Sequence, residues 1–220
     1  MRQFIFFFFA AVHCFSQSLP KGFVYLNKID PSIQIDLRYI TDNNFIGSPI
    51  DGYQKKVIIT TLPTAEALHK IQTELLKDSL SLKIFDAYRP QQAVDHFMKW
   101  AKKPNDTLKK SQFYPNVKKS ALFKKGYIAK KSSHTRGSTV DVTIVDLKKG
   151  EALDMGSSFD FFGKISHPFS TKINTMQKKN RMTLRAIMVK YNFKPYDQEW
   201  WHFTLKGEIF PNTYYNFFVE

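Results

Sequence analysis

The chain has 220 residues, of which 43% are hydrophobic and 15% aromatic. These values are typical of one globular domain of ordinary size, large enough to bury a core, and they exclude a disordered chain. The formal charge is +14, which is strongly basic, and the single cysteine excludes a disulfide within the chain.

The N-terminus predicts export. Arg2 is followed by the short apolar run of residues 4–12, too short for a stable membrane anchor of about 20 residues. We interpret residues 1–16 as a signal peptide cleaved after Ser16, leaving a domain over residues 17–220, periplasmic or secreted, with no transmembrane anchor and no cysteine. Acylation of Cys14 to a lipoprotein is a weaker alternative because His13 precedes it, and a buried N-terminal strand is another.

The first half of the chain alternates strands and helices. Residues 32–37 alternate as an early strand, and residues 37–47 are rich in turn formers, so they predict a loop. Leu68, Ile71 and Leu75 recur at helical spacing within a helix over 62–78 that has a proline in its first turn. Residues 81–88 predict a strand that stops at Arg89-Pro90, and a second helix follows through Trp100.

Residues 102–131 form a long connection with ten lysines and one acid, Asp106. A solvated, partly irregular loop is the simplest interpretation. The alternative is a basic patch that weakly attracts anionic envelope polymers. We predict no nucleic-acid partner, because no nucleic-acid motif accompanies the charge.

The most informative stretch is 132–141, Ser-Ser-His-Thr-Arg-Gly-Ser-Thr-Val-Asp. It places His134 and Asp141 on either side of Gly137, which allows a turn that brings both side chains together. Residues 139–145 alternate as a strand, with Asp141 and Thr143 expected to face a cleft.

The last third supplies the remaining candidates. Asp160 lies in an aromatic turn, and a third helix is expected over residues 172–191, its methionines filling the core. Glu199 and His202 flank the start of a strand over 200–205, so they share a site only if Glu199 sits in a bend before it. Two imidazoles and one carboxylate form a three-ligand set for one Zn²⁺ per chain, and a remaining glutamate is a candidate base. Because helices and strands do not alternate evenly, we expect an α+β fold.

These segments resemble the zinc D-alanyl-D-alanine dipeptidases of the VanX type. The resemblance rests on residues 132–141 and on Glu199-Trp200-Trp201-His202, and it extends through 39–53, 86–90, 155–160, Asn180-Arg181 and Pro211-Asn212. It implies a single α+β domain of the hedgehog-like D,D-peptidase group, with a small, mainly antiparallel sheet flanked by helices. Thr139, where this family commonly has alanine, is a departure.

The resemblance also implies roles. His134, Asp141 and His202 match the zinc ligands and Glu199 the catalytic base. Arg89 matches the arginine that polarises the scissile carbonyl. Asp160 and Tyr39 match residues that hold the ammonium of a small D,D-dipeptide, with Ser132 beside them.

The implied activity is hydrolysis of D-Ala-D-Ala, and export favours salvage of wall-derived dipeptide. Two alternatives remain open. One is a D,D-carboxypeptidase acting on longer wall peptides, and the other is a non-catalytic wall-binding module.

Overall fold

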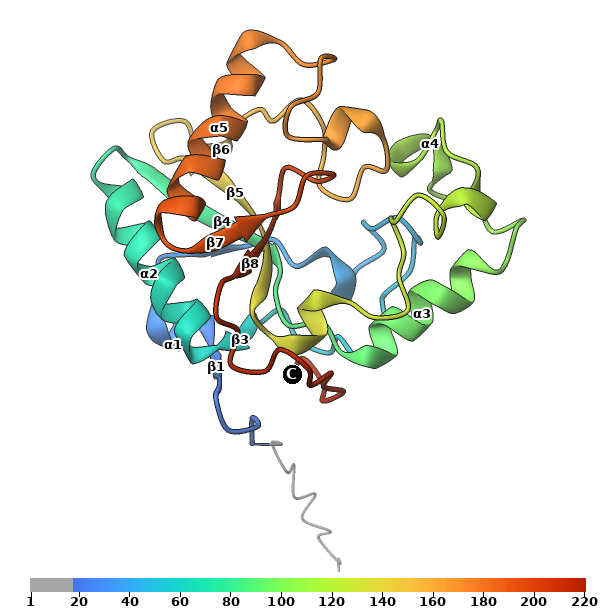
Figure 1. The fold of residues 1–220 in the computed structure, drawn as a ribbon, viewed down its shortest axis with the longest axis horizontal. Helices are drawn as coiled ribbons and strands as arrows, with labels where there is room; N and C mark the ends of the chain where they lie inside the picture. The colour runs from blue at the N-terminus through green and yellow to red at the C-terminus, as the bar shows by residue number, and fades with distance from the viewer. Residues whose placement is uncertain (1–17) are drawn as a thin grey trace, which may run out of the picture.

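The computed structural model describes residues 18–220 (Figure 1). The signal peptide predicted over residues 1–16, Cys14 included, therefore lies outside the described residues. Within 18–220, no helix is both long and apolar enough to cross a membrane.

The chain folds as an α+β domain built on two sheets. The strands are β1 (Phe23–Tyr25), β2 (Gln34–Ile35), β3 (Ile59–Thr61), β4 (Leu80–Asp86), β5 (Thr139–Asp146), β6 (Glu151–Ala152), β7 (Phe193–Pro195) and β8 (His202–Leu205). The α-helices are α1 (Leu26–Ile29), α2 (Leu62–Leu76), α3 (Gln91–Ala101), α4 (Lys110–Phe113) and α5 (Thr175–Lys190). Short 3-10 turns are η1 (Arg38–Ile40), η2 (Lys119–Ala121), η3 (Ser133–Arg136) and η4 (Lys164–Ser166).

The main sheet has the order β2-β4-β5-β8-β7, with β6 paired to β5, and β1 pairs with β3 in a separate two-stranded sheet. All pairs are antiparallel except β2 with β4. In Figure 1, α2 lies at the left of the strands, α5 above them, and α3 and α4 at right. The expected small, mainly antiparallel sheet flanked by helices is confirmed.

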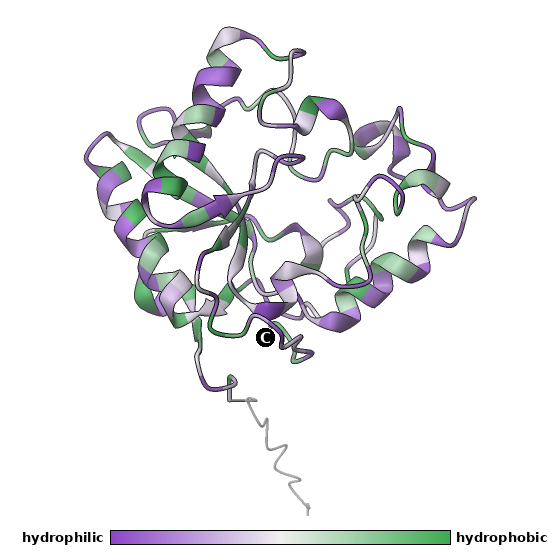
Figure 2. Ribbon diagram, viewed as in Figure 1, coloured by the Kyte–Doolittle hydropathy of each residue, from purple (hydrophilic) through white to green (hydrophobic). Residues whose placement is uncertain are grey.

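Apolar residues gather on the central strands, whereas the helices carry both hydrophilic and apolar residues along their length (Figure 2). The core strands β4 and β5 are almost wholly buried, as are Leu68, Ile71 and Leu75 of α2. Burial of these apolar side chains is the main favourable term in folding.

Three sequence expectations need correction. The strand expected over 200–205 begins only at His202, because residues 200 and 201 belong to a turn. Met176 is 61% exposed and does not fill the core, although Met188 does. Lys119, within the lysine-rich connection, is buried, and its Nζ donates to the carbonyls of Lys103 and Asp106 and lies 3.8 Å from the Trp100 ring centroid.

Candidate metal centre and active site

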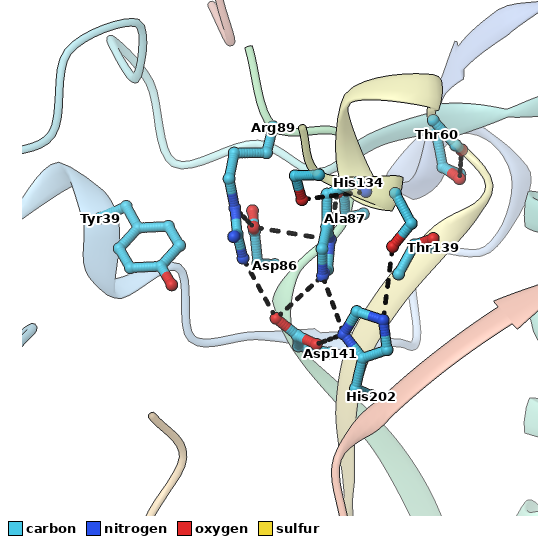
Figure 3. A network of polar contacts seen from close by, with 12 residues as sticks. Tyr39, Thr60, Asp86, Ala87, Arg89, His134, Thr139, Asp141 and His202 are labelled. Atoms are coloured by element: carbon cyan, nitrogen blue, oxygen red, sulfur yellow. Dashed lines mark hydrogen bonds and ion pairs between the residues drawn. The ribbon is translucent and has the colours of Figure 1, made fainter. Parts of the chain in front are cut away.

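Three side chains from separate elements converge beside the main sheet. His134 lies in η3, Asp141 in β5 and His202 in β8, and each offers a ligand atom within 4.8 Å of the others. His134 Nε2 lies 3.2 Å from His202 Nδ1 and 3.3 Å from Asp141 Oδ2, and His202 Nδ1 lies 3.1 Å from Asp141 Oδ1 (Figure 3). Asp141 and His202 meet because they are directly paired across β5 and β8.

A tight turn brings His134 back to the strand. Gly137 adopts φ +82, and its N–H donates to the His134 carbonyl at 2.9 Å. His134 Nδ1 donates to the Ala87 carbonyl at 2.8 Å, which leaves Nε2 unprotonated and facing the cluster. Such a backbone contact is the usual way a protein fixes the orientation of a metal-binding imidazole.

The electrostatics of the cluster suit a cation. Burial alone would raise the pKa of Asp141, but His134 and His202 outweigh burial and hold it well below its ordinary value. Asp141 is therefore a carboxylate beside two imidazole nitrogens, a donor set that zinc binds readily. His134, Asp141 and His202 would hold the ion, so the three ligands expected from the sequence are brought together.

Glu199 occupies the turn immediately before β8, which resolves the alternation problem of the sequence. Its Oε2 lies 3.7 Å from His202 Nδ1, although strict strand geometry would put the two on opposite faces. Burial raises the pKa of Glu199 to about 7. A carboxyl group with this pKa can both accept and return a proton near neutral pH.

Arg89 follows the end of β4 and points into the same site. Its Nε donates to Asp86 Oδ2 at 2.8 Å and its Nη2 to Asp141 Oδ2 at 3.4 Å. The guanidinium carbon lies 5.3 Å from the centroid of the Tyr39 ring. The cation is thereby fixed beside the ligand cluster, where it can act on a developing negative charge.

Asp160 and Tyr39 form a buried pair at one end of the site. The Tyr39 hydroxyl donates to Asp160 Oδ2 at 2.8 Å, and Tyr39 and Asp160 are 1% and 7% exposed respectively. Burial, with a further contribution from Asp141, raises the pKa of Asp160 well above its ordinary value. This carboxyl group lacks a full countercharge, so it favours a cationic ligand group.

Ser132 also lines the site, but its hydroxyl accepts a hydrogen bond from the His134 N–H at 3.3 Å. It therefore stabilises the turn of η3. No hydrogen bond joins Ser132 to Asp160 among residues 18–220. Thr143, expected in the cleft with Asp141, instead lines a separate hollow with Phe85 and Phe159.

Sequence reasoning gave no role to Asp86, although it holds Arg89 in place. Asp86 Oδ2 also lies 3.7 Å from His134 Nδ1, and Tyr53 donates to Asp86 Oδ1 at 2.7 Å. The available signal was a carboxylate ending an apolar strand three residues before Arg89. Asp86 itself does not line the pocket, so it acts on the site through Arg89 and His134.

The ligand cluster, Glu199, Arg89 and the Asp160–Tyr39 pair all face one pocket of about 420 Å³. The pocket combines a three-ligand metal set, a half-buried glutamate with a raised pKa, a fixed arginine and a buried carboxyl group 2.8 Å from a tyrosine hydroxyl. Such a combination defines a metal-dependent hydrolase of small substrates.

Comparison with known proteins identifies the family. Residues 20–220 match the Peptidase_M15 family model, described as D-ala-D-ala dipeptidase. A D-alanyl-D-alanine dipeptidase of Enterococcus faecalis is 42% identical over 92% of this chain and 100% of its own length. A D-alanyl-D-alanine dipeptidase of Enterococcus faecium is 41% identical over 90% of this chain and 98% of its own length.

A solved structure, a vancomycin-resistance D,D-pentapeptidase VanY variant with Zn(II), overlaps more weakly. Its TM-score is 0.41 at 12% identity, covering 70% of this chain and 77% of the other. The family match covers nearly the whole described chain, so this protein belongs to the Peptidase_M15 family of zinc metallopeptidases.

Proposed function

We propose that this protein hydrolyses the free dipeptide D-Ala-D-Ala, with Glu199 as general base. The observation that carries the proposal is the buried Asp160–Tyr39 pair in the same pocket as the His134, Asp141 and His202 cluster. It supplies an acceptor for a free ammonium beside a metal set that suits peptide hydrolysis. The curated relatives carry the same activity in their names.

Substrate binding starts with the ammonium. Asp160 accepts it through the carboxylate, and the Tyr39 hydroxyl fixes the carboxylate's orientation. The aromatic rings of Phe45, Phe97 and Phe162 line the same pocket, and in this proposal they exclude a longer or N-blocked chain. The pocket therefore selects short substrates with a free N-terminus.

Bond cleavage uses two further side chains. When bound, zinc supplies Lewis-acid polarisation and makes water a stronger nucleophile near neutral pH. Arg89 stabilises the negative charge that develops on the scissile carbonyl oxygen. Glu199 accepts the proton of the attacking water at a carboxylate oxygen and then returns it to the leaving amine.

We also propose that the chain is exported after loss of residues 1–16 and salvages wall-derived dipeptide. The support is the pattern of Arg2 followed by a short apolar run. Exposed lysines of the 102–131 connection would add a weak attraction to anionic envelope polymers. Cell fractionation is the test, since activity found wholly in the cytosol would overturn the export proposal.

The deciding experiment measures alanine release from D-Ala-D-Ala and from N-acetyl-D-Ala-D-Ala by the purified, zinc-loaded protein. We expect hydrolysis of the free dipeptide alone. Hydrolysis of both would favour a D,D-carboxypeptidase. Hydrolysis of neither by folded, zinc-loaded protein would overturn the assignment and favour the wall-binding module.

A further inference from the structure

Two lysines line the same pocket as the metal ligands and Asp160. We propose that Lys131 and Lys194 form a subsite for the C-terminal carboxylate of the substrate. This inference deepens the proposed dipeptide hydrolysis and rests on it. It assigns the second charged end of the substrate, which neither the metal ligands nor the Asp160–Tyr39 pair accounts for.

The sheet sets the direction of the bound substrate. Asp86 of β4 pairs with Asp141 of β5, and Asp141 pairs with His202 of β8. The Tyr196 N–H, just after β7, donates to the His202 carbonyl at 3.0 Å, which completes this row. The metal ligands therefore lie between the β4 side of the pocket and the β7 side.

The ammonium subsite lies on the β4 side. Phe159, next to Asp160 in the chain, stacks on Phe85 of β4 with ring centroids 4.6 Å apart. Tyr39 lies beyond Arg89, on the side opposite His202 (Figure 3). A substrate with its ammonium at Asp160 and its peptide bond over the ligand cluster must direct its carboxylate toward β8 and β7.

Lys194 lies in β7, on the side toward which the carboxylate is directed. It pairs with Thr204, which lies two residues after His202 on β8 and therefore on the same face. Tyr196, two residues after Lys194, supports the same face, because its ring centroid lies 5.4 Å from that of His202. β7 is two strand spacings, roughly 10 Å, from β5, and a flexible four-carbon stem shortens the gap.

Lys131 approaches the same region from the loop before η3. It lies two residues before Ser133, whose Oγ is 3.4 Å from the outer nitrogen, Nε2, of His202. Lys131 lines the pocket, and its Nζ lies 4.9 Å from the centroid of the Tyr214 ring. Because a dipeptide spans at most about 7 Å, the far end of a substrate seated over the ligand cluster stays within the pocket that both lysines line.

The charges of the pocket support this assignment. Four side chains with a fixed positive charge line it, namely Arg89, Lys131, Arg136 and Lys194. Arg89 is paired with Asp86, and Arg136 forms a two-point pair with Glu208 at 2.7 and 2.8 Å. Within residues 18–220, neither Lys131 nor Lys194 forms an ion pair, so these two cations are available for a carboxylate.

The test compares D-Ala-D-Ala with its C-terminal amide in the full-length, zinc-loaded protein. We expect Lys131→Met and Lys194→Met each to lower kcat/KM for the dipeptide about tenfold, mainly through KM, the size of one lost charge-assisted contact. The double variant should have a lower kcat/KM for the dipeptide than either single variant. Values for the amide should stay within about twofold in all variants, because the amide lacks the charge that the lysines recognise.

If the amide is not cleaved, its competitive inhibition constant provides the same comparison. Lys124→Met is the matched control, because Lys124 is exposed in the same basic segment and does not line the pocket. If the lysine variants lower kcat/KM equally for the dipeptide and the amide, or lower it for neither, the inference is overturned while the dipeptidase proposal stays in place. A wild-type protein that cleaves no dipeptide would overturn both.

Discussion

At the scale of single residues, Glu199 is the group whose position decides whether the site is catalytic. It lies half-buried beside His202, yet it is not one of the three clustered ligands. Replacing Glu199 with Gln should lower kcat by about 10²- to 10⁴-fold, the usual contribution of a general base. Bound zinc, measured by elemental analysis, should remain near one per chain.

Glu151→Gln is a suitable control because Glu151 is exposed in the short strand β6. A Glu199→Gln protein that keeps wild-type turnover would exclude the base assignment. A protein that loses zinc as well as turnover would instead make Glu199 part of the metal site.

Asp160 governs selectivity at the same scale. Asp160→Asn keeps the shape of the side chain but removes the charge that pairs with the ammonium. We expect kcat/KM for D-Ala-D-Ala to fall about 30-fold or more, as when one partner of a buried charge pair is lost. The ratio of kcat/KM for the free dipeptide to that for the N-acetylated dipeptide should fall as well. Asp197→Asn is the control, because the Asp197 side chain is 79% exposed. It should change neither kcat/KM for D-Ala-D-Ala nor this ratio.

At the scale of elements, the turn from η3 into β5 depends on Gly137. Its φ is +82, and a Cβ there would lie 2.2 Å from Phe23 Cε1. We expect Gly137→Ala to lower the free energy of unfolding by about 3 kcal/mol, combining backbone strain with overpacking. Urea denaturation measures the change.

Gly150 is the matched control, because its φ is +73 but nothing lies within 4 Å of the position that a Cβ would take. Gly150→Ala should therefore lower the free energy of unfolding only by the backbone strain, about 1 to 2 kcal/mol. Equal losses at both glycines would contradict a steric role for the contact with Phe23.

Asp30 links helix α2 to the N-terminal segment and introduces a pH dependence. Burial would raise the pKa of Asp30, but hydrogen bonds from Ser32 and His69 outweigh burial and lower it. A lowered pKa means that the charged form stabilises the fold. That contribution is complete above the ordinary value of about 4 and is lost as the pH falls below it.

Asp30→Asn should therefore be less stable than the wild type at pH 7, by about 1 to 2 kcal/mol. The difference in free energy of unfolding between Asp30→Asn and the wild type should become smaller as the pH is lowered to about 3. Urea denaturation at several pH values gives the comparison, with the exposed Asp42→Asn as control. A difference that stays constant with pH would show that the charge of Asp30 does not matter.

At the scale of the whole molecule, we expect metal binding to be coupled to folding, because the three candidate ligands come from three elements. His134, Asp141 and His202 come from η3, β5 and β8, so a bound ion would join segments that are far apart in the chain. Zinc at about 1,000 times its dissociation constant stabilises the folded state by about 4 kcal/mol. Removing zinc should lower Tm by roughly 10 °C for a domain of this size.

Differential scanning calorimetry with and without chelator measures this shift. His202→Ala should show the low Tm at the start and respond little to the chelator. An unchanged Tm for the wild type after verified zinc removal would show that the site does not link these elements in stability.

The sequence by itself determined the long elements and indicated which residues to expect at the site. The periodicity of α2 and α5 and the apolar runs of β4 and β5 are local signals, because each element buries a face set by its own residue spacing. His134, Asp141, Glu199 and His202 were recognised because residue type and spacing restrict which side chains can bind a metal or carry a proton.

Only the tertiary structure decided how these parts meet. The pairing of Asp86, Asp141 and His202 in one row depends on strand register, which is set by packing across the sheet and not by any one segment. The same holds for the Ala87 carbonyl that orients His134, the burial of Lys119 and the turn that holds Glu199. These features join residues distant in sequence, so no local pattern contains them.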